Sequence, residues 1–416
     1  MPESNRVCPH AKLFDPAGVH RNDPHPFLAR ARREQPVFYA PQFDRWCVTR
    51  YDDIVTILRD KQNFSARDHK PAPLNAELPP DVLETLATWR GDEESVATRW
   101  DGLDHTKMRA VAGAQFTQRA LSPFESDIRG TAAALTARLV ARGDIDFISE
   151  FAIPFTLNTI LKILGIPDEF QDRCRRWSQH WHALKLNHPD LSDSAFARQA
   201  AQSLREFGSF ARDMVAQRKS RPRDDVISHM LHNSQSERSL TATEVVALLP
   251  TIISAGHETS AQALALIVSD QLDSPGGWSE LSGGHVPIAG MIEESLRLEA
   301  PLFGVFRTAK RPVTVGGIQL AEGSRLLLLC GSGNHDENRY ENPTQRNVER
   351  KFDSPHLSFG LGSHFCVGAP LARLELTIAM EELAAGLPQL TLAPEASRSY
   401  HPIFPLRALT ELRLLT

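Results

Sequence analysis

The chain has 416 residues, of which 41% are hydrophobic and 23% are charged, and its formal net charge is −5. This balance is typical of a globular protein with a large core and excludes a disordered or fibrous chain. A charge this close to neutral gives no overall case for nucleic-acid binding, so we expect no nucleic-acid partner.

The N-terminal segment, MPESNRVCPHAKLFDP, has no apolar core of signal-peptide length and no basic start followed by small residues. No later stretch approaches the ~18 continuous apolar residues of a membrane span. These features predict a soluble, cytoplasmic protein without membrane contact. The cysteines form no CxxC pair, so we expect no disulfide framework, zinc ribbon or iron–sulfur domain.

The first predicted elements are a hairpin and a short helix. Residues 36–39 and 46–49 alternate like two strands, and turn-forming residues fill positions 41–44 between them. Residues 52–60 then predict an amphipathic helix that opens at Asp52.

A long irregular connection is predicted over residues 66–104, with one short helix near residues 81–89. Long connections in a compact domain are usually functional or mobile. From about residue 105 to about residue 235 the pattern is mostly helical. The predicted breaks fall at Gly143, at residues 165–167 and at residues 221–222.

A long helix begins at a capping-box pattern formed by Thr241 and Glu244 and continues to about Asp270. At roughly 30 residues, or about 45 Å, it is long enough to cross a whole domain. It is apolar on most faces and should be buried. Pro250 and Gly256 lie inside it and favour local distortion.

The C-terminal third combines helices with small strands. A helix is predicted over residues 286–299, and two short apolar runs, 313–315 and 318–320, flank a Gly-Gly hairpin turn. A strand over residues 325–329 and a final helix from about 369 to about 387 follow. The chain is therefore predicted to be mainly α, with a minor α+β part of small edge sheets.

The most specific segment runs from Phe359 to Gly368, FGLGSHFCVG, immediately before the last predicted helix; we call it the cysteine loop. Backbone N–H groups at a helix start favour a nearby thiolate, which suits Cys366 as a metal ligand. Glycines such as Gly360 allow tight turns and the close approach of a planar ligand. The alternatives are a buried structural cysteine and a zinc site shared with His364, which lacks two further ligands at suitable spacing.

The cysteine loop resembles the heme-binding loop of the cytochrome P-450 family, FxxGxxxCxG, at every fixed position. The resemblance is strongest to bacterial catalytic domains that are sometimes fused to a reductase. It implies one catalytic domain over residues 1–416, with the triangular helical fold of the family and no fused reductase or ferredoxin domain. It also implies heme b, iron protoporphyrin IX, with Cys366 as the axial ligand of the iron. The other implied heme contacts in the loop are Phe359, Gly360, Gly368 and His364, the last facing a propionate.

Glu294 and Arg297, three residues apart on one predicted helix face, can form an ion pair. Alone, such a pair is common on surfaces and contributes little to stability. It also resembles the ExxR motif of the family, which implies a buried network that fixes the segment leading to the cysteine loop. A third partner, an arginine, is expected after Pro343, where Gln345 occupies the expected place and Arg346 follows it.

The long helix contains AGHETS, which resembles the oxygen-binding motif of the family. The resemblance implies that Ala255 and Gly256 keep the helix wall thin above the iron. It implies that Glu258 and Thr259 are the acid and the hydroxyl that deliver protons during oxygen activation. Alternatively, Thr259 bonds back to the carbonyl four residues earlier. His257 is interpreted as structural.

His105 and Arg109 resemble the HxxxR segment of the family and, four residues apart, can reach one heme propionate. An isolated pair of this kind would usually be a solvated helix face. Arg307 fits the arginine that binds the other propionate. The residues implied to line the substrate pocket are Leu302, Phe303, Gly304 and Val305.

As a whole, the resemblance implies a monooxygenase that activates O2 and hydroxylates or otherwise oxidises a small hydrophobic organic substrate, in natural-product tailoring or catabolism. Electrons would come ultimately from NAD(P)H through a separate ferredoxin and ferredoxin reductase, for which Lys107, Arg109 and Arg373 are candidate docking residues. Two alternatives remain: a heme-thiolate catalyst of oxidative coupling or another oxidation without oxygen insertion, and a heme-binding sensor or carrier.

Two segments are expected to form a lid that opens and closes over the substrate, residues 66–104 and about 170–200. The second segment carries four aromatic or imidazole side chains that either face the substrate or pack helices, and packing is the favoured interpretation. They are Trp177, His180, Trp181 and His182.

Overall fold

The computed structural model describes residues 14–67, 78–93, 101–186, 188–232, 240–394 and 398–416. The chain divides into two compact units. The first, which we call the sheet unit, comprises Met1–Leu74, Glu293–Cys366 and Arg398–Thr410. The second, which we call the helical unit, comprises Asn75–Ile292, Val367–Ser397 and Glu411–Thr416.

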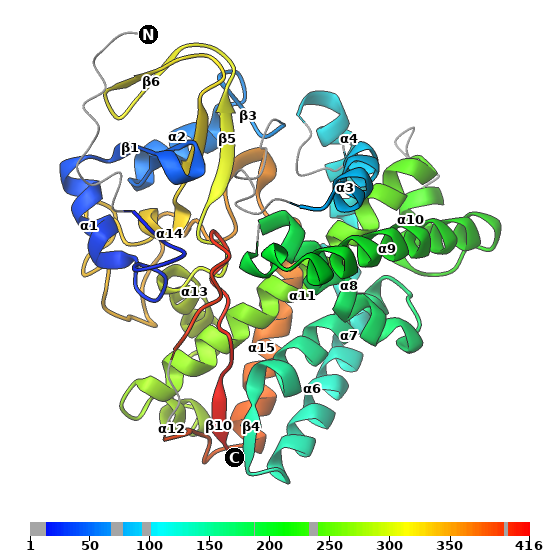
Figure 1. Cartoon of the computed structure of the whole chain (residues 1–416). Coiled ribbons are helices and arrows are strands. Elements are labelled where there is room, and N and C mark those ends of the chain that lie inside the picture. Colours follow the sequence, from blue (N-terminus) through cyan, green and yellow to red (C-terminus); the bar gives the residue numbers. More distant parts are fainter. Residues whose placement is uncertain (1–13, 68–77, 94–100, 187, 233–239, 395–397) are drawn as a thin grey trace. The chain divides into compact units, whose positions relative to one another are not determined.

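The sheet unit is built on a five-stranded sheet with the order β1-β2-β8-β5-β3 (Figure 1). Its strands are β1 (Val37–Ala40), β2 (Arg45–Val48), β3 (Phe64–Ser65), β5 (Val305–Ala309) and β8 (Arg325–Leu328). β2 and β8 pair in parallel, and the other neighbours are antiparallel. The parallel pairing joins the N-terminal hairpin to a strand far along the chain, with Cys47 opposite Leu327.

The predicted N-terminal hairpin is confirmed. β1 and β2 pair with Val37 opposite Val48. Asp44 ends the turn between them with a φ of 51°, a left-handed conformation that Asp tolerates better than most residues. Its carboxylate also accepts a hydrogen bond from the Tyr39 hydroxyl at 2.6 Å, which fixes the turn against β1.

The helix after the hairpin is α2 (Tyr51–Arg59), which begins one residue before the predicted start at Asp52. The N-cap is Arg50, whose side chain makes no capping bond. Asp52 lies in the first turn, where its negative charge is favourable beside the positive helix end. The Tyr51 N–H is instead satisfied by the carboxylate of Asp336 at 2.9 Å, a residue that no local pattern could indicate.

The other hairpin of the sheet unit confirms its Gly-Gly signal. β6 (Val313–Val315) pairs with β7 (Ile318–Leu320), and the turn glycines, Gly316 and Gly317, have φ values of 52° and 82°. The helices that lie in the sheet unit or enter it are α1 (His25–Glu34), α2, α13 (Ile288–Leu298) and α14 (Cys330–Gly333).

The alternation of side chains along β8 divides the core of the sheet unit into two clusters. Leu326 and Leu328 pack with Ile54 and Leu58 of α2 on one face of the sheet. Leu327 points to the opposite face and packs in a second cluster rich in phenylalanine. The second cluster includes Phe14, Phe27, Phe38 and Phe303.

The helical unit confirms the predicted run of helices and its breaks at Gly143, Gly165 and Arg221; both glycines have positive φ values and Arg221 ends α9. Its main helices are α3 (Pro80–Glu93), α4 (Gly102–Ala114), α6 (Glu125–Val140), α7 (Ile153–Ile163), α8 (Gln171–Leu186), α9 (Ser194–Ser220), α10 (Val226–His232), α11 (Ala242–Asp273) and α15 (Ala369–Gly386). No helix in the described ranges combines the length and the apolar character that a membrane crossing needs.

The long helix is α11, a continuous helix of 32 residues that starts at the predicted capping box of Thr241 and Glu244. It passes through Pro250 and Gly256 and is packed by α7, α8, α9 and α15 (Figure 1). A Cβ added to Gly256 would lie 2.9 Å from the Cγ1 of Ile160 on α7. The glycine is therefore required for the close approach of α7 to α11.

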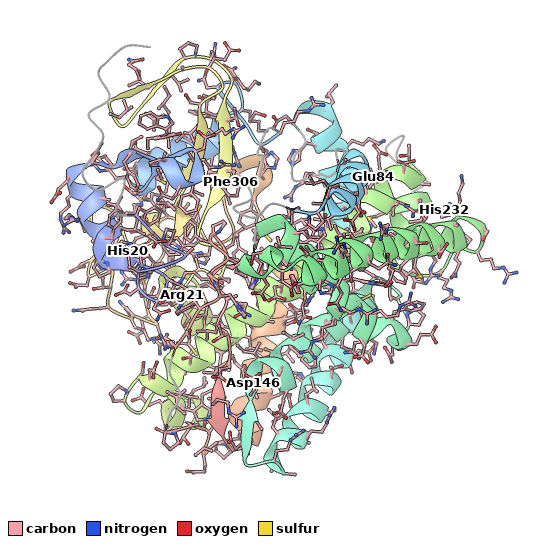
Figure 2. The ribbon with its side chains drawn as sticks, viewed as in Figure 1. His20, Arg21, Glu84, Asp146, His232 and Phe306 are labelled. Carbon is pink, nitrogen blue, oxygen red and sulfur yellow. The ribbon has the colours of Figure 1, made fainter. Side chains whose placement is uncertain are left out.

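A three-stranded sheet with the order β4-β10-β9 was not predicted, because its strands are only two or three residues long. The strands are β4 (Asp144–Asp146), β9 (Thr391–Leu392) and β10 (Arg413–Leu415). Asp146, labelled in Figure 2, accepts hydrogen bonds from the Leu412 N–H at 3.0 Å and the Ser149 hydroxyl at 2.6 Å. The predicted fold class, mainly α with small sheets, is confirmed.

Candidate active site

The cysteine loop turns back on itself immediately before α15. The Cys366 N–H donates to the Phe359 carbonyl at 2.8 Å and closes the loop. Gly360 and Gly362 have φ values of 67° and 74°. A Cβ on Gly362 would lie 2.5 Å from the carbonyl oxygen of Leu58 on α2, so glycine is needed for the contact between loop and helix.

Cys366 is the accessible thiol among the described cysteines. Cys366 is exposed, whereas Cys47, Cys174 and Cys330 are buried. Burial raises the pKa of Cys174 and of Cys330 to about 12, and it also raises the pKa of Cys47. Thiols buried in this way stay protonated, whereas an iron ligand must be a thiolate that the iron can reach. Cys366 therefore fits the expected heme, and the described residues contain no cluster of His, Cys, Asp and Glu that could hold a metal ion instead.

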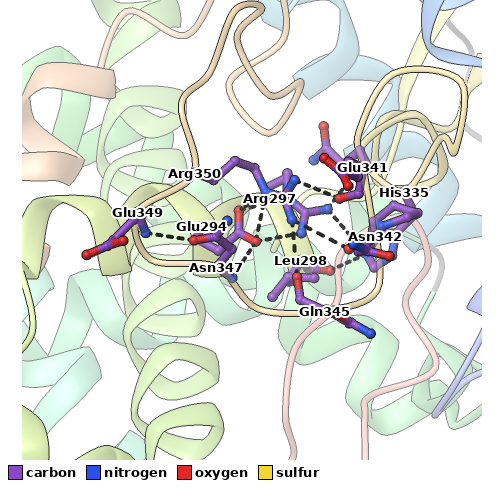
Figure 3. Close-up of polar contacts among 12 residues, drawn as sticks. Glu294, Arg297, Leu298, His335, Glu341, Asn342, Gln345, Asn347, Glu349 and Arg350 are labelled. Atoms are coloured by element: carbon purple, nitrogen blue, oxygen red, sulfur yellow. Dashed lines mark hydrogen bonds and ion pairs between the residues drawn. The ribbon is translucent and has the colours of Figure 1, made fainter.

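Glu294 and Arg297 form a buried ion pair on α13 (Figure 3). Arg297 donates to the two carboxylate oxygens at 2.7 and 2.8 Å, and both side chains are 0% exposed. Arg350 donates to the same carboxylate at 3.0 and 3.1 Å, and the Asn347 N–H donates at 3.0 Å. Two guanidinium groups and a backbone N–H thus satisfy the carboxylate, as a buried charge requires.

The third partner of this network is Arg350, an arginine after Pro343 as expected, and neither Gln345 nor Arg346 takes that place. Gln345 takes part through its backbone carbonyl, which accepts from Arg350 at 3.2 Å. Burial, with a contribution from Arg398, lowers the pKa of Arg346 to about 10. No sequence signal pointed to Arg350, because an irregular segment does not determine which of its arginines turns toward Glu294.

Arg297 also links α13 to the cysteine loop. It donates to the carbonyl oxygens of Asn334 and Pro343 at 2.8 and 2.7 Å. The Asn334 side chain accepts from the Leu357 N–H at 2.6 Å and donates to the Ser358 hydroxyl at 2.9 Å. Because Leu357 and Ser358 come directly before the cysteine loop, the network holds the segment from which the loop emerges.

The acid and the hydroxyl of the AGHETS segment lie at the middle of α11. The Thr259 hydroxyl donates to the Ala255 carbonyl at 2.9 Å, so its lone pairs remain to accept. Ala255, one turn from Thr259, is exposed in a helix that is buried along most of its length. The Glu258 side chain is 14% exposed and that of His257 is 0% exposed. A small exposed surface with an acid and a hydroxyl is what the resemblance predicts beside a heme.

The basic residues expected at the propionates lie in both units. His105 and Arg109 are one turn apart on α4 of the helical unit, where His105 is buried and Arg109 is half-buried. Arg307 lies on β5 of the sheet unit, buried, and donates to the preceding carbonyl at 2.7 Å. Lys107, a candidate docking residue, forms an ion pair with Glu244 at 3.1 Å.

The four residues expected to line the substrate pocket have different environments. Phe303 is 1% exposed and belongs to the phenylalanine-rich core of the sheet unit. A Cβ at Gly304 would lie 2.9 Å from a leucine of β8, which explains the glycine by sheet packing. Leu302 and Val305 are half-buried.

The aromatic side chains of α8 mainly pack helices. Trp177 is buried, stacks on Phe207 at 5.2 Å between ring centroids, and donates to Glu206 at 3.0 Å. His180 lies 2.7 Å from the Ser203 hydroxyl of α9. Trp181 is also buried, and His182 is half-buried. Of the first expected lid segment, residues 68–77 and 94–100 lie outside the described residues.

Comparison with known proteins identifies relatives of one kind. A family model described as Cytochrome P450 matches residues 288–384, which include α13, Arg350 and the cysteine loop. The cyclomarin C epoxidase CymV of Salinispora arenicola is 31% identical over 362 residues, covering 86% of this chain and 87% of that protein. The erythromycin C-12 hydroxylase of Saccharopolyspora erythraea is 28% identical over 376 residues, covering 90% of each chain.

Solved structures of similar proteins have the same fold. The P450 heme domain of Tepidiphilus thermophilus superposes with a TM-score of 0.88 at 26% identity, covering 98% of this chain and 97% of that one. The structure of cytochrome P450 CREJ in complex with (4-ethylphenyl) dihydrogen phosphate has a TM-score of 0.86 at 28% identity, covering 95% of this chain and 97% of that one.

Proposed function

The chain belongs to the cytochrome P450 family of heme-containing monooxygenases, and on this premise we propose that Cys366 is the axial ligand of a heme b and that the enzyme oxidises a small hydrophobic organic substrate. Family membership brings with it the use of heme iron, O2 and electrons from a redox partner. The observation that carries the proposal is the exposure of the Cys366 thiol in a loop whose base the Glu294 network holds.

When bound, the heme supplies the activation of O2 and the transfer of one oxygen atom to the substrate. The protein must hold this group and exclude water from it. Arg109 and Arg307 have the charge, and together with His105 the hydrogen-bond donors, that the propionates require. The cysteine loop would contribute heme contacts through Phe359, Gly360, His364 and Gly368, and α11 would contribute Ala255 and Gly256.

Glu258 and Thr259 are assigned to proton delivery. The partial exposure of Glu258 allows its carboxyl to exchange protons with solvent, which a general acid needs in each cycle. The Thr259 hydroxyl already donates to the Ala255 carbonyl and can accept from a neighbouring acid or water. Loss of either group should release reduced oxygen as peroxide instead of transferring oxygen to the substrate.

The relatives suggest a substrate class. Their names describe an epoxidase of cyclomarin C and a C-12 hydroxylase of erythromycin, and one similar structure, CYP109E1 from Bacillus megaterium, is in complex with testosterone. These names share the oxidation or the binding of an organic compound. We assign the chain to hydroxylation or a related oxidation of such a compound, in natural-product tailoring or catabolism.

We assign NAD(P)H as the ultimate source of the electrons. A separate ferredoxin reductase and ferredoxin would carry them to the enzyme. Lys107, Arg109 and Arg373 are the candidates for the docking face; Lys107 also pairs with Glu244, and Arg109 is also assigned to a propionate. Steering by so few charges would weaken as salt increases.

The absorption spectrum of the reduced, CO-bound protein tests the proposal. A red-shifted Soret band of the thiolate type is expected for the wild-type protein and for Cys174→Ala, which removes a buried thiol of the helical unit. The band should be absent from Cys366→Ala. Purified protein without porphyrin, or an unchanged band in Cys366→Ala, would contradict the assignment.

A further inference from the structure

His257 was interpreted from the sequence as structural. It lies beside Glu258, the acid of the proposed proton relay, by which we mean the pair of Glu258 and Thr259. Its imidazole is 0% exposed, and Nδ1 lies 2.7 Å from the Ile253 carbonyl oxygen. A carbonyl oxygen only accepts hydrogen bonds, so Nδ1 carries the ring proton. In the neutral ring, Nε2 is therefore a lone-pair acceptor.

This Nε2 atom is buried and finds no hydrogen-bond partner within the described part of the chain. The Oε2 atom of Glu258 lies 3.8 Å away, about 1 Å beyond hydrogen-bond distance. If Glu258 is ionised, both facing atoms carry lone pairs and cannot bond. If Glu258 is protonated, its O–H gains an acceptor and the buried nitrogen gains a donor.

The surroundings keep His257 neutral, which preserves Nε2 as an acceptor. Burial lowers the pKa of His257, and Arg175 on α8 lowers it further, against the opposing effects of Glu258 and the Ile253 carbonyl. From α7, the neighbours are the uncharged side chains of Thr156 and Ile160.

A second imidazole on α8, His182, interacts with the same acid. Burial lowers the pKa of His182 to about 4, Glu258 opposes that shift, and His257 and Lys185 add to it. Its Nδ1 atom lies 3.0 Å from the Ser178 carbonyl oxygen. His182 is therefore also neutral near pH 7 and does not act as a fixed positive partner of Glu258.

Contacts with α7 and α8 hold the segment of α11 that carries His257. The Thr156 hydroxyl donates to the His257 carbonyl at 3.1 Å, and the Ser254 hydroxyl donates to Ser178 at 3.1 Å. Glu258 is the partly exposed member of the pair. A shift of about 1 Å in its carboxyl group would form the hydrogen bond.

We propose that His257 is a positioning residue of the proton relay: its Nε2 atom accepts a hydrogen bond from protonated Glu258 and so favours the acid form that supplies Thr259. This inference rests on the proposed function, in which Glu258 and Thr259 deliver protons. In each delivery the Glu258 O–H bond breaks and its proton moves to the Thr259 oxygen, while the Thr259 hydroxyl turns from the Ala255 carbonyl and gives its own proton to the reduced oxygen. A solvent proton then restores the Glu258 O–H bond against His257.

Infrared difference spectra recorded on the resting protein as the pH is lowered test the hydrogen bond without turnover. The band of the protonated Glu258 carboxyl is the one that disappears in Glu258→Gln. In His257→Leu, which has no acceptor, the protonated fraction at a fixed pH should fall about tenfold, the size of a change of one pH unit. In His257→Gln, whose amide oxygen can accept, it should fall by less than about threefold.

Equal bands in the wild-type protein and His257→Leu would overturn the inference. If the leucine variant does not fold, the wild-type protein decides. In the reduced, CO-bound form labelled with ¹⁵N-histidine, the resonance of His257 Nε2 should move toward that of a hydrogen-bonded acceptor as the Glu258 band grows. A resonance that does not change with the band would contradict the proposal.

A second measurement uses a surrogate ferredoxin and ferredoxin reductase. The peroxide released per NADPH oxidised should rise severalfold in His257→Leu and much less in His257→Gln. The matched control is His182→Leu, which alters the same cluster but keeps the Nε2 atom of His257. Its peroxide release should stay within about twofold of wild type. An equal rise in His257→Gln or His182→Leu would refute the positioning role.

Absence of the thiolate Soret band from the wild-type protein would instead refute the proposed function, while the infrared titration would still decide the hydrogen bond.

Discussion

Arg350 donates from its Nε atom to both carboxylate oxygens of Glu294, at 3.1 and 3.0 Å. Glu294 is 0% exposed and Arg350 is 9% exposed, so the pair is almost completely removed from solvent. Breaking one side of a buried pair is costly because the remaining charge loses its compensation. Here Arg297 stays as a second partner, which limits the cost.

We expect Arg350→Gln to lower the free energy of unfolding by about 2–3 kcal/mol, the typical worth of a hydrogen bond to a charged group plus residual desolvation. It should also weaken heme retention, because Glu294 and Arg297 hold the segment before the cysteine loop. Urea unfolding measures the first effect and heme loss on dialysis the second. The control is Gln345→Ala, whose exposed side chain should leave the free energy of unfolding within about 0.5 kcal/mol of wild type. Equal changes in the free energy of unfolding and in heme loss for the two substitutions would contradict the role of Arg350 in the network.

Thr259→Ala should separate catalysis from stability. The hydroxyl bonds to a carbonyl of its own helix, so its removal should change the free energy of unfolding by less than about 1 kcal/mol. Peroxide release per NADPH oxidised should increase severalfold, because proton delivery is impaired. The control is Thr131→Ala on α6, which removes the same type of bond, at 2.9 Å to the Asp127 carbonyl, far from the relay in sequence. Wild-type peroxide release in Thr259→Ala would argue that the hydroxyl is only structural.

Glu375, on α15, should make the protein progressively less stable as the pH rises above the usual pKa of a glutamate. The residue is 1% exposed, and burial raises its pKa well above the usual 4.5, while the Ser260 hydroxyl partly opposes the shift. The unfolded chain therefore releases this proton at a lower pH than the folded protein. Stability is complete below about pH 4.5 and falls by up to about 1.4 kcal/mol per pH unit as the pH rises toward the folded-state value.

Glu375→Gln should remove this slope and raise the free energy of unfolding at pH 8 relative to wild type. Unfolding curves at several values between pH 5 and pH 8 measure it. The control is Glu382→Gln on the same helix, where the carboxylate pairs with Arg129 at 2.9 Å near the surface. A Glu375→Gln variant that is less stable than wild type at pH 8 would show that the carboxyl group is ionised in the fold.

Gly256→Ala should destabilise the helical unit by about 1–3 kcal/mol, because the new methyl group would overlap Ile160 of α7 at 2.9 Å. In the background of Ile160→Ala, the same substitution should cost much less, since the overlapping side chain is gone. A double-mutant cycle by chemical unfolding measures the coupling. Additive effects of the two substitutions would mean that α7 does not constrain Gly256.

The features that could be predicted from sequence are those encoded locally. The capping box of Thr241 and Glu244 and the Gly316-Gly317 turn each bring together the residues that form them, so both elements were found near their true bounds. The cysteine loop was recognisable because its glycines and Cys366 lie within ten residues. The ion pair of Glu294 and Arg297 was also predictable, because the two residues are three positions apart on one helix.

The features that escaped prediction depend on distant parts of the chain. β5 was not expected as a strand, because its pairing with β8 and β3 is what makes Val305 to Ala309 extended. Arg350 and Arg346 are alike in sequence, and only the folded segment turns one of them toward Glu294. Gly256 was expected to distort the long helix and to thin its wall above the iron, and its contact with Ile160 could not be read from either helix separately.

The bonds of Asn334 have a consequence for the timing of maturation. Its carbonyl accepts from Arg297, its side chain bonds to Leu357 and Ser358, and the Ser358 hydroxyl donates to the Leu296 carbonyl at 2.6 Å. These contacts join segments 23 to 62 positions apart, and contacts of such range form late when a chain folds. We therefore expect the thiol to reach its final position after these supports have assembled, and the prosthetic group to be captured by a largely folded polypeptide rather than to nucleate it.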